Sequence, residues 1–302
     1  MGKKYILVIG SINTDMVIKV KNIPAPGETI LGNGFFLNTG GKGANQAVAA
    51  AKLGGTVFFI GKVGDDVFGG KCIQSLKNEG IQTEFIEAVP ETASGIAMIT
   101  VDEKGENSIV VAPGANYELN VSDIDHKDAL FELSEFIVIQ LEIPLETVAH
   151  IIQKGKRLGK KVILNPAPAH QLDDKLFEDL YLITPNETEA EILTGVEITD
   201  EETAKAAGRR LLDKGVKNVI ITLGRKGALV MNSEICEIVA APTVKAVDTT
   251  AAGDTFNGAL TVALSEKMDI RSAAEFACKA ASISVGRFGA QVSMPYRQEL
   301  SA

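Results

Sequence analysis

The segment Val247–Ala259, which reads VDTTAAGDTFNGA, contains the residue types that a group-transfer reaction needs. Two small residues and a glycine precede Asp254, and an apolar, helix-forming run follows it. This order predicts a helix N-terminus, where unpaired backbone N–H groups and the helix dipole favour negative charge. A carboxylate beside such an anion hole suits phosphoryl transfer to an alcohol, because it can accept the hydroxyl proton. The segment alone is equally compatible with Asp254 acting only as a first-turn residue of a buried helix.

A second glycine-rich cluster, NTGGKGANQ at 38–46, surrounds a single lysine. Its three glycines permit close approach of a ligand to the backbone, and a helix beginning near Ala44 would supply free amide groups. The Walker A pattern is absent, because Lys42 is followed by Gly43 rather than by serine or threonine. The cluster therefore predicts a ligand-binding loop, with a tight turn into a helix as the alternative.

Polar residues also follow predicted strands near the N-terminus and in the middle of the chain. Asn13 and Asp15 come directly after the first strand, where they could recognise hydroxyl groups or form an Asx-type turn. Glu142 follows a later strand, and could bind a ligand or serve only as a first-turn carboxylate. The carboxyl ends of these strands are therefore candidate positions for substrate recognition.

Two further motifs each allow two interpretations. Asn186 and Glu189 are three residues apart and share a helical face, which suits either a water-bound magnesium near phosphates or a helix cap. The segment 222–227, which reads TLGRKG, ends another strand and could cradle a nucleotide or simply form a hairpin.

The elements that would position these groups alternate between short apolar runs and segments of helical period. Buried parallel strands, rich in Ile and Val and without a clean polar face, are predicted at 4–9, 56–60, 136–139, 161–164, 181–183 and 218–222. Helices with typical start and stop residues are predicted at 44–53, 67–79, 145–158, 201–214, 253–266 and 270–288. The alternation predicts an α/β fold, a doubly wound, mostly parallel sheet flanked by helices in a single domain over 1–302.

Two stretches, about 16–38 and 84–111, break this alternation. Both show strand-type patterns separated by turns, and neither contains a convincing helix. We expect them to pair into a small separate β-sheet that forms a lid over the carboxyl edge of the main sheet, where α/β proteins bind ligands. Two ordinary hairpins are the alternative, but long insertions in compact domains favour a lid.

Composition argues against several classes of partner. The 302 residues carry a net charge of −9 at pH 7, which disfavours nucleic acid or an anionic membrane as the main partner. No apolar run has the length of a membrane span, and the N-terminal residues lack the layout of a signal peptide. The three cysteines lie far apart and form no C-x-x-C pair, which predicts a reduced cytoplasmic protein without disulfides or structural zinc.

Taken together, the ordered motifs resemble those of the PfkB-type carbohydrate kinases across essentially the whole chain. The matching pieces are Asn13-x-Asp15, Gly40-Gly-Lys-Gly-Ala-Asn45, Val63-Gly-Asp-Asp66, Asn186-x-x-Glu189 and Asp248-Thr-Thr-Ala-Ala-Gly-Asp254. Ala112-Pro-Gly-Ala-Asn116 and Gly289-Ala-Gln291 are similar to the family members that act on ribose. The resemblance implies ATP-dependent phosphorylation of the 5-hydroxyl of D-ribose, with Mg²⁺ and K⁺ as cofactors.

The resemblance also implies a role for each matched residue. Asp254 would be the general base, and Ala251, Ala252 and Gly253 would supply the anion hole. The residues that hold the sugar and close its pocket would be Asn13, Thr14, Asp15, Gly41, Lys42, Gly43, Ala44, Asn45 and Glu142. The nucleotide would contact Asn186, Thr222, Leu223, Gly224, Arg225, Lys226, Gly227, Gly253, Asp254 and Cys278. Cys278 stands where some relatives carry a histidine near adenine, a departure that concerns the adenine contacts rather than the chemistry.

Metal ions and a second subunit complete the implied picture. A potassium ion beneath the anion hole would fix its amides toward the phosphate, and its ligands would be Asp248, Thr250, Ser284, Arg287, Gly289 and Ser293. Glu189 would support the magnesium ion indirectly, and we expect a homodimer formed through the lid. The alternatives are a kinase for another pentose, deoxyribose or a nucleoside, and a catalytically silent sugar-binding regulator. The retained Asp254 and Gly253 argue against the last of these.

Overall fold

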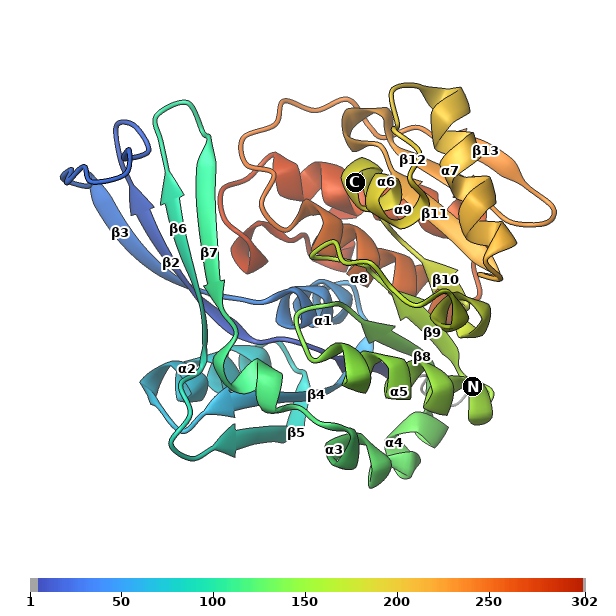
Figure 1. The fold of residues 1–302 in the computed structure, drawn as a ribbon, viewed down its shortest axis with the longest axis horizontal. Coiled ribbons are helices and arrows are strands. Elements are labelled where there is room, and N and C mark those ends of the chain that lie inside the picture. The colour runs from blue at the N-terminus through green and yellow to red at the C-terminus, as the bar shows by residue number, and fades with distance from the viewer. Residues whose placement is uncertain (1–4, 301–302) are drawn as a thin grey trace.

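The large β-sheet confirms the predicted open, mostly parallel arrangement (Figure 1). The computed structural model describes residues 5–300, so Lys4, which was expected in the first strand, lies outside the described residues. The strand order is β13-β12-β11-β10-β9-β8-β1-β4-β5, and all neighbours pair parallel except β12, which pairs antiparallel with both β11 and β13. The strands are β1 (Tyr5–Ile9), β4 (Thr56–Gly64), β5 (Gln82–Val89), β8 (Ser134–Ile139), β9 (Lys161–Leu164), β10 (Leu182–Ile183), β11 (Asn218–Thr222), β12 (Ala228–Met231) and β13 (Cys236–Val239).

Helices cover both faces of this sheet, because its strands carry apolar side chains on both sides. In β1, Ile6 and Val8 belong to one hydrophobic core, whereas Leu7 and Ile9 belong to the other. The first core is covered by α1 (Lys42–Lys52), α2 (Val67–Asn78), α8 (Ala252–Ser265) and α9 (Ile270–Val285). The second is covered by α3 (Val121–Asp125), α4 (Asp128–Leu133), α5 (Leu145–Arg157), α6 (Glu187–Thr194) and α7 (Glu201–Asp213). Within residues 5–300, no helix has both the length and the apolar character that a membrane crossing requires.

The predicted helices are present, with shifts at their ends. The helix expected from Ala44 begins two residues earlier, at Lys42, and the one expected to end at Phe288 ends at Val285. The connections contain short 3₁₀ helices, η1 (Gly114–Glu118), η2 (Asp174–Asp179), η3 (Gly224–Lys226), η4 (Gln291–Ser293) and η5 (Arg297–Leu300). Residues 286–290 therefore form a loop between α9 and η4 instead of a last helical turn.

A separate four-stranded sheet stands beside the helical layers (Figure 1). Its order is β3-β2-β6-β7, from β2 (Asn13–Lys19), β3 (Gly34–Gly40), β6 (Gly95–Val101) and β7 (Asn107–Ala112). The expected start of the second insertion at residue 84 is wrong, because 84–89 belongs to β5 and pairs with β4 in the large sheet. As an edge strand, β5 is only partly buried, so its mixed polar and apolar pattern resembles that of an inserted hairpin.

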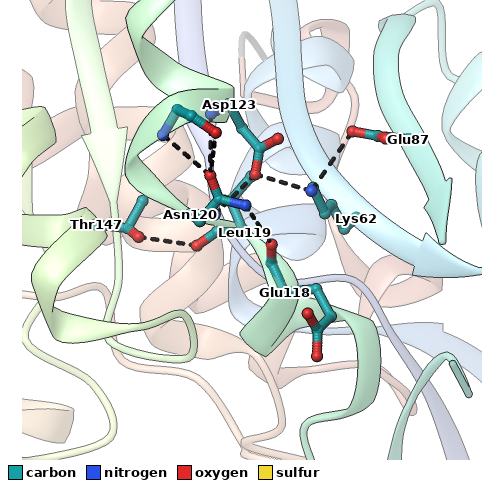
Figure 2. A network of polar contacts seen from close by, with 8 residues as sticks. Lys62, Glu87, Glu118, Leu119, Asn120, Asp123 and Thr147 are labelled. Atoms are coloured by element: carbon teal, nitrogen blue, oxygen red, sulfur yellow. Dashed lines mark hydrogen bonds and ion pairs between the residues drawn. The ribbon is translucent and has the colours of Figure 1, made fainter.

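The chain returns from the small sheet through η1 into α3, and a network of polar contacts holds this segment (Figure 2). Asn120 accepts a hydrogen bond from the Asp123 amide, and Asp123 Oδ2 accepts one from the Asn120 amide, which makes a capping box. The buried Lys62 Nζ of β4 lies 2.8 Å from Asp123 Oδ2 and 3.5 Å from Glu87 Oε2. Lys62, Glu87 and Asp123 are thus paired with one another, which indicates a structural role.

Candidate active site

The loop before α8 places Asp254 in the first helical turn beside unpaired backbone N–H groups. Ala251 caps the helix in the left-handed conformation, with φ 58° and ψ 18°. Among the described residues, the amides of Ala251, Gly253 and Asp254 donate to no protein acceptor. The Ala252 amide differs from the expectation, because it donates to the Thr249 carbonyl at 3.2 Å and closes the turn. The space beside Gly253 is open, with no other atom within 4 Å of where a Cβ would lie.

The carboxylate of Asp254 is held by two consecutive residues of α1. Asn45 Nδ2 donates to Asp254 Oδ2 at 3.0 Å, and Gln46 Nε2 donates to Asp254 Oδ1 at 3.0 Å. Asp254 is 8% exposed, so these two donors replace much of the water that would otherwise solvate it. The sequence prediction named Asn45 but missed Gln46, although Gln46 follows it directly in the glycine-rich cluster.

The start of β2 brings two of the predicted sugar-binding residues together. Asn13 and Asp15 are buried and share one face of the small sheet, since side chains two apart in a strand point the same way. Burial, followed by the negative charges of Glu142 and Asp254, raises the pKa of Asp15 to about 7. Thr14 departs from the expectation, because its hydroxyl lies on the opposite face, 3.6 Å from the Cys72 sulfur.

The N-terminus of α1 has no free amides, which corrects the interpretation of the glycine-rich cluster. The Lys42 amide donates to Glu142 Oε2 at 3.0 Å. The Gly43 and Ala44 amides donate to the hydroxyl and the carbonyl of Ser11, at 3.4 and 2.9 Å. The Ser11 hydroxyl in turn donates to Glu142 Oε2 at 2.5 Å. Glu142 is thus the acceptor for the first turn of another helix, a role that the sequence did not suggest.

Two glycines of this cluster are required by close packing of the backbone. Gly41 has φ +90°, and a Cβ there would lie 2.7 Å from the Asn13 nitrogen. A Cβ on Gly43 would lie 2.7 Å from the carbonyl carbon of Gly10. These glycines therefore let α1 start directly against the connection from β1 to β2, which brings the side chains of α1 to the site.

The Lys42 side chain extends from α1 into a cavity of about 180 Å³ that also contacts Asp254, Asn186, Glu189 and Thr222. Burial acts to lower the pKa of Lys42, but the surrounding carboxylates, led by Asp254 and Glu142, outweigh it and raise the pKa. The cavity therefore joins the Lys42 ammonium, the predicted base and the predicted nucleotide residues Asn186 and Thr222.

Asn186 and Glu189 confirm the helix-cap interpretation of their motif. They form a capping box at the start of α6, in which each accepts a hydrogen bond from the other's amide, at 2.8 and 2.9 Å. Both also line the cavity, and burial raises the pKa of Glu189. Within residues 5–300, no group of three or more His, Cys, Asp or Glu side chains is arranged to hold a metal ion. A magnesium ion here would depend mainly on phosphate oxygens and water.

The segment 222–227 forms a hairpin between β11 and β12, which confirms that interpretation. Gly224, Arg225 and Lys226 are exposed, whereas Leu223 is buried in the core. The glycine at 227 is required, because a Cβ there would lie 1.9 Å from the Val239 carbonyl oxygen. Thr222 also bridges to Asn186, so the hairpin and the start of α6 lie side by side at the cavity.

Cys278 lies within α9 and is 4% exposed, as a member of the hydrophobic core. Burial raises the pKa of its thiol to about 11. The thiol is therefore neutral at physiological pH and contributes packing to this part of the protein.

The predicted cation ligands meet behind the α8 N-terminus in two groups. Asp248 accepts hydrogen bonds from the amides of Thr250 and Gly289, both at 2.9 Å. Burial acts to raise the pKa of Asp248, but these hydrogen bonds outweigh it, so its pKa is lowered. The Ser284 and Ser293 hydroxyls lie 2.7 Å apart. The Arg287 side chain is not available as a cation ligand, because its guanidinium pairs with Glu299. Only the Arg287 main chain could contact a cation.

Comparison with known proteins agrees with this geometry. Residues 3–297 match the profile of the pfkB family carbohydrate kinases. The chain is 47% identical over 297 residues to a ribokinase of Haemophilus influenzae, covering 98% of this chain and 97% of that one. It is 44% identical over 291 residues to a deoxyribokinase of Salmonella typhimurium, covering 96% and 95%. The structure of Arabidopsis thaliana ribokinase complexed with ribose and ATP matches with a TM-score of 0.91, 30% identity and coverage of 100% and 98%. The chain belongs to the pfkB family of carbohydrate kinases.

Proposed function

We propose that this protein transfers the γ-phosphoryl group of ATP to the 5-hydroxyl of D-ribose, giving D-ribose 5-phosphate and ADP. The observation that carries the proposal is the position of Asp254. Its carboxylate is held by Asn45 and Gln46, adjoins unpaired amides of α8, and opens on the cavity that Lys42 and the predicted nucleotide residues line. The similarity to ribokinases, including one solved with ribose and ATP, supports the choice of substrates.

In this mechanism Asp254 acts as the general base. Its carboxylate accepts the proton of the 5-hydroxyl while that oxygen forms a bond to the γ-phosphorus and the bond to the bridging oxygen of ADP breaks. The amides of Ala251, Gly253 and Asp254 hold the charge on the transferred phosphoryl oxygens. The Lys42 ammonium lines the same cavity and offsets further negative charge.

Two cations fit the residues present. Magnesium, supported indirectly by Glu189, would neutralise the phosphates of ATP. Potassium suits the oxygen atoms of Asp248, Thr250, Ser284 and Ser293, because the lowered pKa of Asp248 keeps a carboxylate ionised there. Since Thr255 of α8 donates a hydrogen bond to Ser284, a cation in this cluster would hold the α8 N-terminus in place.

We propose that the small sheet is the lid of the sugar site and also the surface of a homodimer. Its strands carry exposed apolar side chains on both faces: Ile18, Phe35, Phe36, Leu37, Met98, Ile109, Val110 and Val111. An apolar surface of this kind favours a protein partner. Phe35→Asp and Phe36→Asp test opposite faces of β3. We expect light scattering to show a wild-type dimer and a monomer for at least one variant, whereas a wild-type monomer at all concentrations would contradict the proposal.

A cytoplasmic location is part of the same proposal. The three cysteines are all free in the structure, and Cys72 and Cys278 are buried. Free thiols are typical of proteins in reducing compartments. Cell fractionation followed by detection of the protein in each fraction would test this location. Recovery outside the cytoplasm would contradict it.

Deoxyribose is the strongest alternative acceptor, because the deoxyribokinase identity of 44% is close to the ribokinase identity of 47%. A coupled assay of ADP release over ribose, deoxyribose, other pentoses and nucleosides separates these functions. We expect the highest kcat/KM with ribose, and higher turnover in potassium than in sodium buffer. Higher kcat/KM with deoxyribose would replace the proposed acceptor, and no turnover with retained sugar binding would indicate a silent regulator.

A further inference from the structure

A series of hydrogen-bonded side-chain amides leads from the carboxyl ends of β8 and β9 to the proposed base. Gln46 is 1% exposed, and its Nε2 donates to Asp254 Oδ1 at 3.0 Å and to Asn165 Oδ1 at 2.9 Å. Its Oε1 accepts a hydrogen bond from Gln140 Nε2 at 2.7 Å. Both hydrogens of the Gln46 amide and one lone pair of its oxygen are therefore used inside the protein.

The two acceptors of the Gln46 amide, Asp254 and Asn165, fix the direction of these hydrogen bonds. Asn165 Nδ2 donates to the Thr184 carbonyl at 3.3 Å, so Asn165 presents its oxygen to Gln46. A flipped Gln46 amide would place its oxygen against two acceptors, Asp254 and Asn165, and its NH₂ against Gln140 Nε2. The network therefore keeps an N–H directed at one oxygen of the Asp254 carboxylate.

Gln140 has a feature that stability alone does not explain. Its Oε1 is buried and has no hydrogen-bond partner among residues 5–300. It occupies space that exists because Gly10 lacks a Cβ, which would lie only 2.2 Å from that oxygen. An unpaired buried acceptor is destabilising, yet it accompanies the hydrogen bond from Gln140 that holds the Gln46 oxygen.

We propose that Gln46 is a positioning residue for phosphoryl transfer, oriented by Gln140, and this rests on the proposed role of Asp254 as base. The Gln46 N–H holds one oxygen of the Asp254 carboxylate and fixes the rotation of its plane, while Asn45 holds the other oxygen. Each carboxylate oxygen then keeps a further lone pair for the acceptor hydroxyl. Gln46 itself touches neither substrate in this scheme.

Two substitutions at Gln46 distinguish positioning from packing. Gln46→Met keeps the approximate length of the side chain and removes the hydrogen-bond donor. Because hydrogen bonds to charged groups are among the stronger ones, we expect kcat to fall about 10- to 100-fold. We expect KM for both substrates to change less than about threefold. Gln46→Glu keeps the shape and the acceptor for Gln140 but faces Asp254 with a carboxyl group. We expect its kcat to fall at least as far, whereas a purely structural role predicts that it retains activity. Gln74→Met, on the outer surface of α2, is the matched control.

A double-mutant cycle with Asp254 completes the test. If Gln46 acts through the base, Gln46→Met lowers kcat in the wild type but not in Asp254→Asn. Likewise, Gln140→Met lowers kcat in the wild type but adds nothing to Gln46→Met. Wild-type kcat in both Gln46 variants, with Asp254→Asn inactive, would overturn the positioning role and leave the proposed function intact. Full turnover of Asp254→Asn would instead remove the base on which the proposal rests. If Gln46→Met does not fold, Gln46→Glu supports the same cycle.

Discussion

Two helix N-termini reach the same site, and they differ in what remains unpaired. At α1, the amides of Lys42, Gly43 and Ala44 are all taken by Glu142 and Ser11. At α8, the amides of Gly253 and Asp254 have no acceptor among the described residues. Both segments contain glycine at the helix start, so glycine content does not identify an anion site. An acceptor supplied from elsewhere in the chain decides whether the amides remain for a ligand.

The two termini consequently contribute different chemistry. The α1 terminus is already neutralised by Glu142 and lies close to the Asp15 carboxyl, so it offers side chains, chiefly Lys42, Asn45 and Gln46. The α8 terminus offers backbone N–H groups and the base. The helices can cooperate because they cross closely at Gly258, where a Cβ would lie 2.5 Å from the Cβ of Ala49. We therefore expect the phosphoryl group at α8 and the sugar beside α1.

The largest expected effect is at α8, from Asp254→Asn. The variant keeps the shape of the side chain but loses the proton acceptor, so we expect kcat to fall about 100- to 10,000-fold, the range of general-base contributions. A coupled assay measures kcat, and calorimetry with ATP checks that nucleotide affinity is kept. Near-normal turnover would show that α8 supplies only the anion hole.

At α1, we expect a loss of stability. Glu142→Ala leaves the Lys42 amide and the Ser11 hydroxyl without their acceptor, at a cost of about 1–3 kcal/mol in unfolding free energy. Glu142→Gln keeps one acceptor oxygen, so we expect a smaller loss. Urea denaturation measures the unfolding free energy of both Glu142 variants. Glu146→Ala, at an exposed first-turn carboxylate of α5, is the control. Unchanged stability in Glu142→Ala would mean that water or another group satisfies this terminus as well.

The carboxyl group of Asp15 gives the α1 side a distinctive pH dependence. Burial and the nearby negative charges raise its pKa to about 7, while an unfolded chain has a value of ~3.9. Its contribution to stability is therefore fully present below pH ~4 and is lost as the pH rises through about 7.

The substitution Asp15→Asn should remove this pH-dependent loss. We expect the variant to be more stable than the wild type at pH 8, by roughly 2–4 kcal/mol, and no more stable at pH 4. Sugar-free protein is compared in urea at both values, with Asp65→Asn at an exposed carboxylate as the control. An equal effect at the two pH values would show that Asp15 is already ionised throughout.

The sequence was sufficient for features that depend on neighbouring residues. The alternation of apolar runs with capped helices predicted the large sheet, because β1 buries side chains on both faces. The Asn186 and Glu189 motif was open between a helix cap and a water-bound magnesium near phosphates; the structure confirms the cap, and both side chains also line the cavity.

Features that depend on distant residues could not be predicted in the same way. The glycine-rich cluster suggested free amides, but their acceptors on Ser11 and Glu142 lie 32 and 100 residues away in the chain. Gln46 was missed because its orientation depends on Gln140, 94 residues further on. The small sheet was predicted, but β5 was assigned to it, since an edge strand and an inserted hairpin have similar patterns.

The smallest expected effect concerns the backbone of the α8 terminus, with the α1 terminus as the contrast. Ala251 adopts φ 58°, where a Cβ costs about 1–2 kcal/mol, whereas Ala251→Gly raises the entropy of the unfolded chain by a comparable amount. We therefore expect a net change within about 1 kcal/mol and kcat within about threefold. Gly41→Ala at the α1 terminus should be clearly destabilising, because its Cβ would lie 2.7 Å from the Asn13 nitrogen. Urea denaturation measures the unfolding free energy of both variants. A large loss of stability in Ala251→Gly would mean that the Ala251 methyl group, and not only its backbone conformation, holds the anion hole in place.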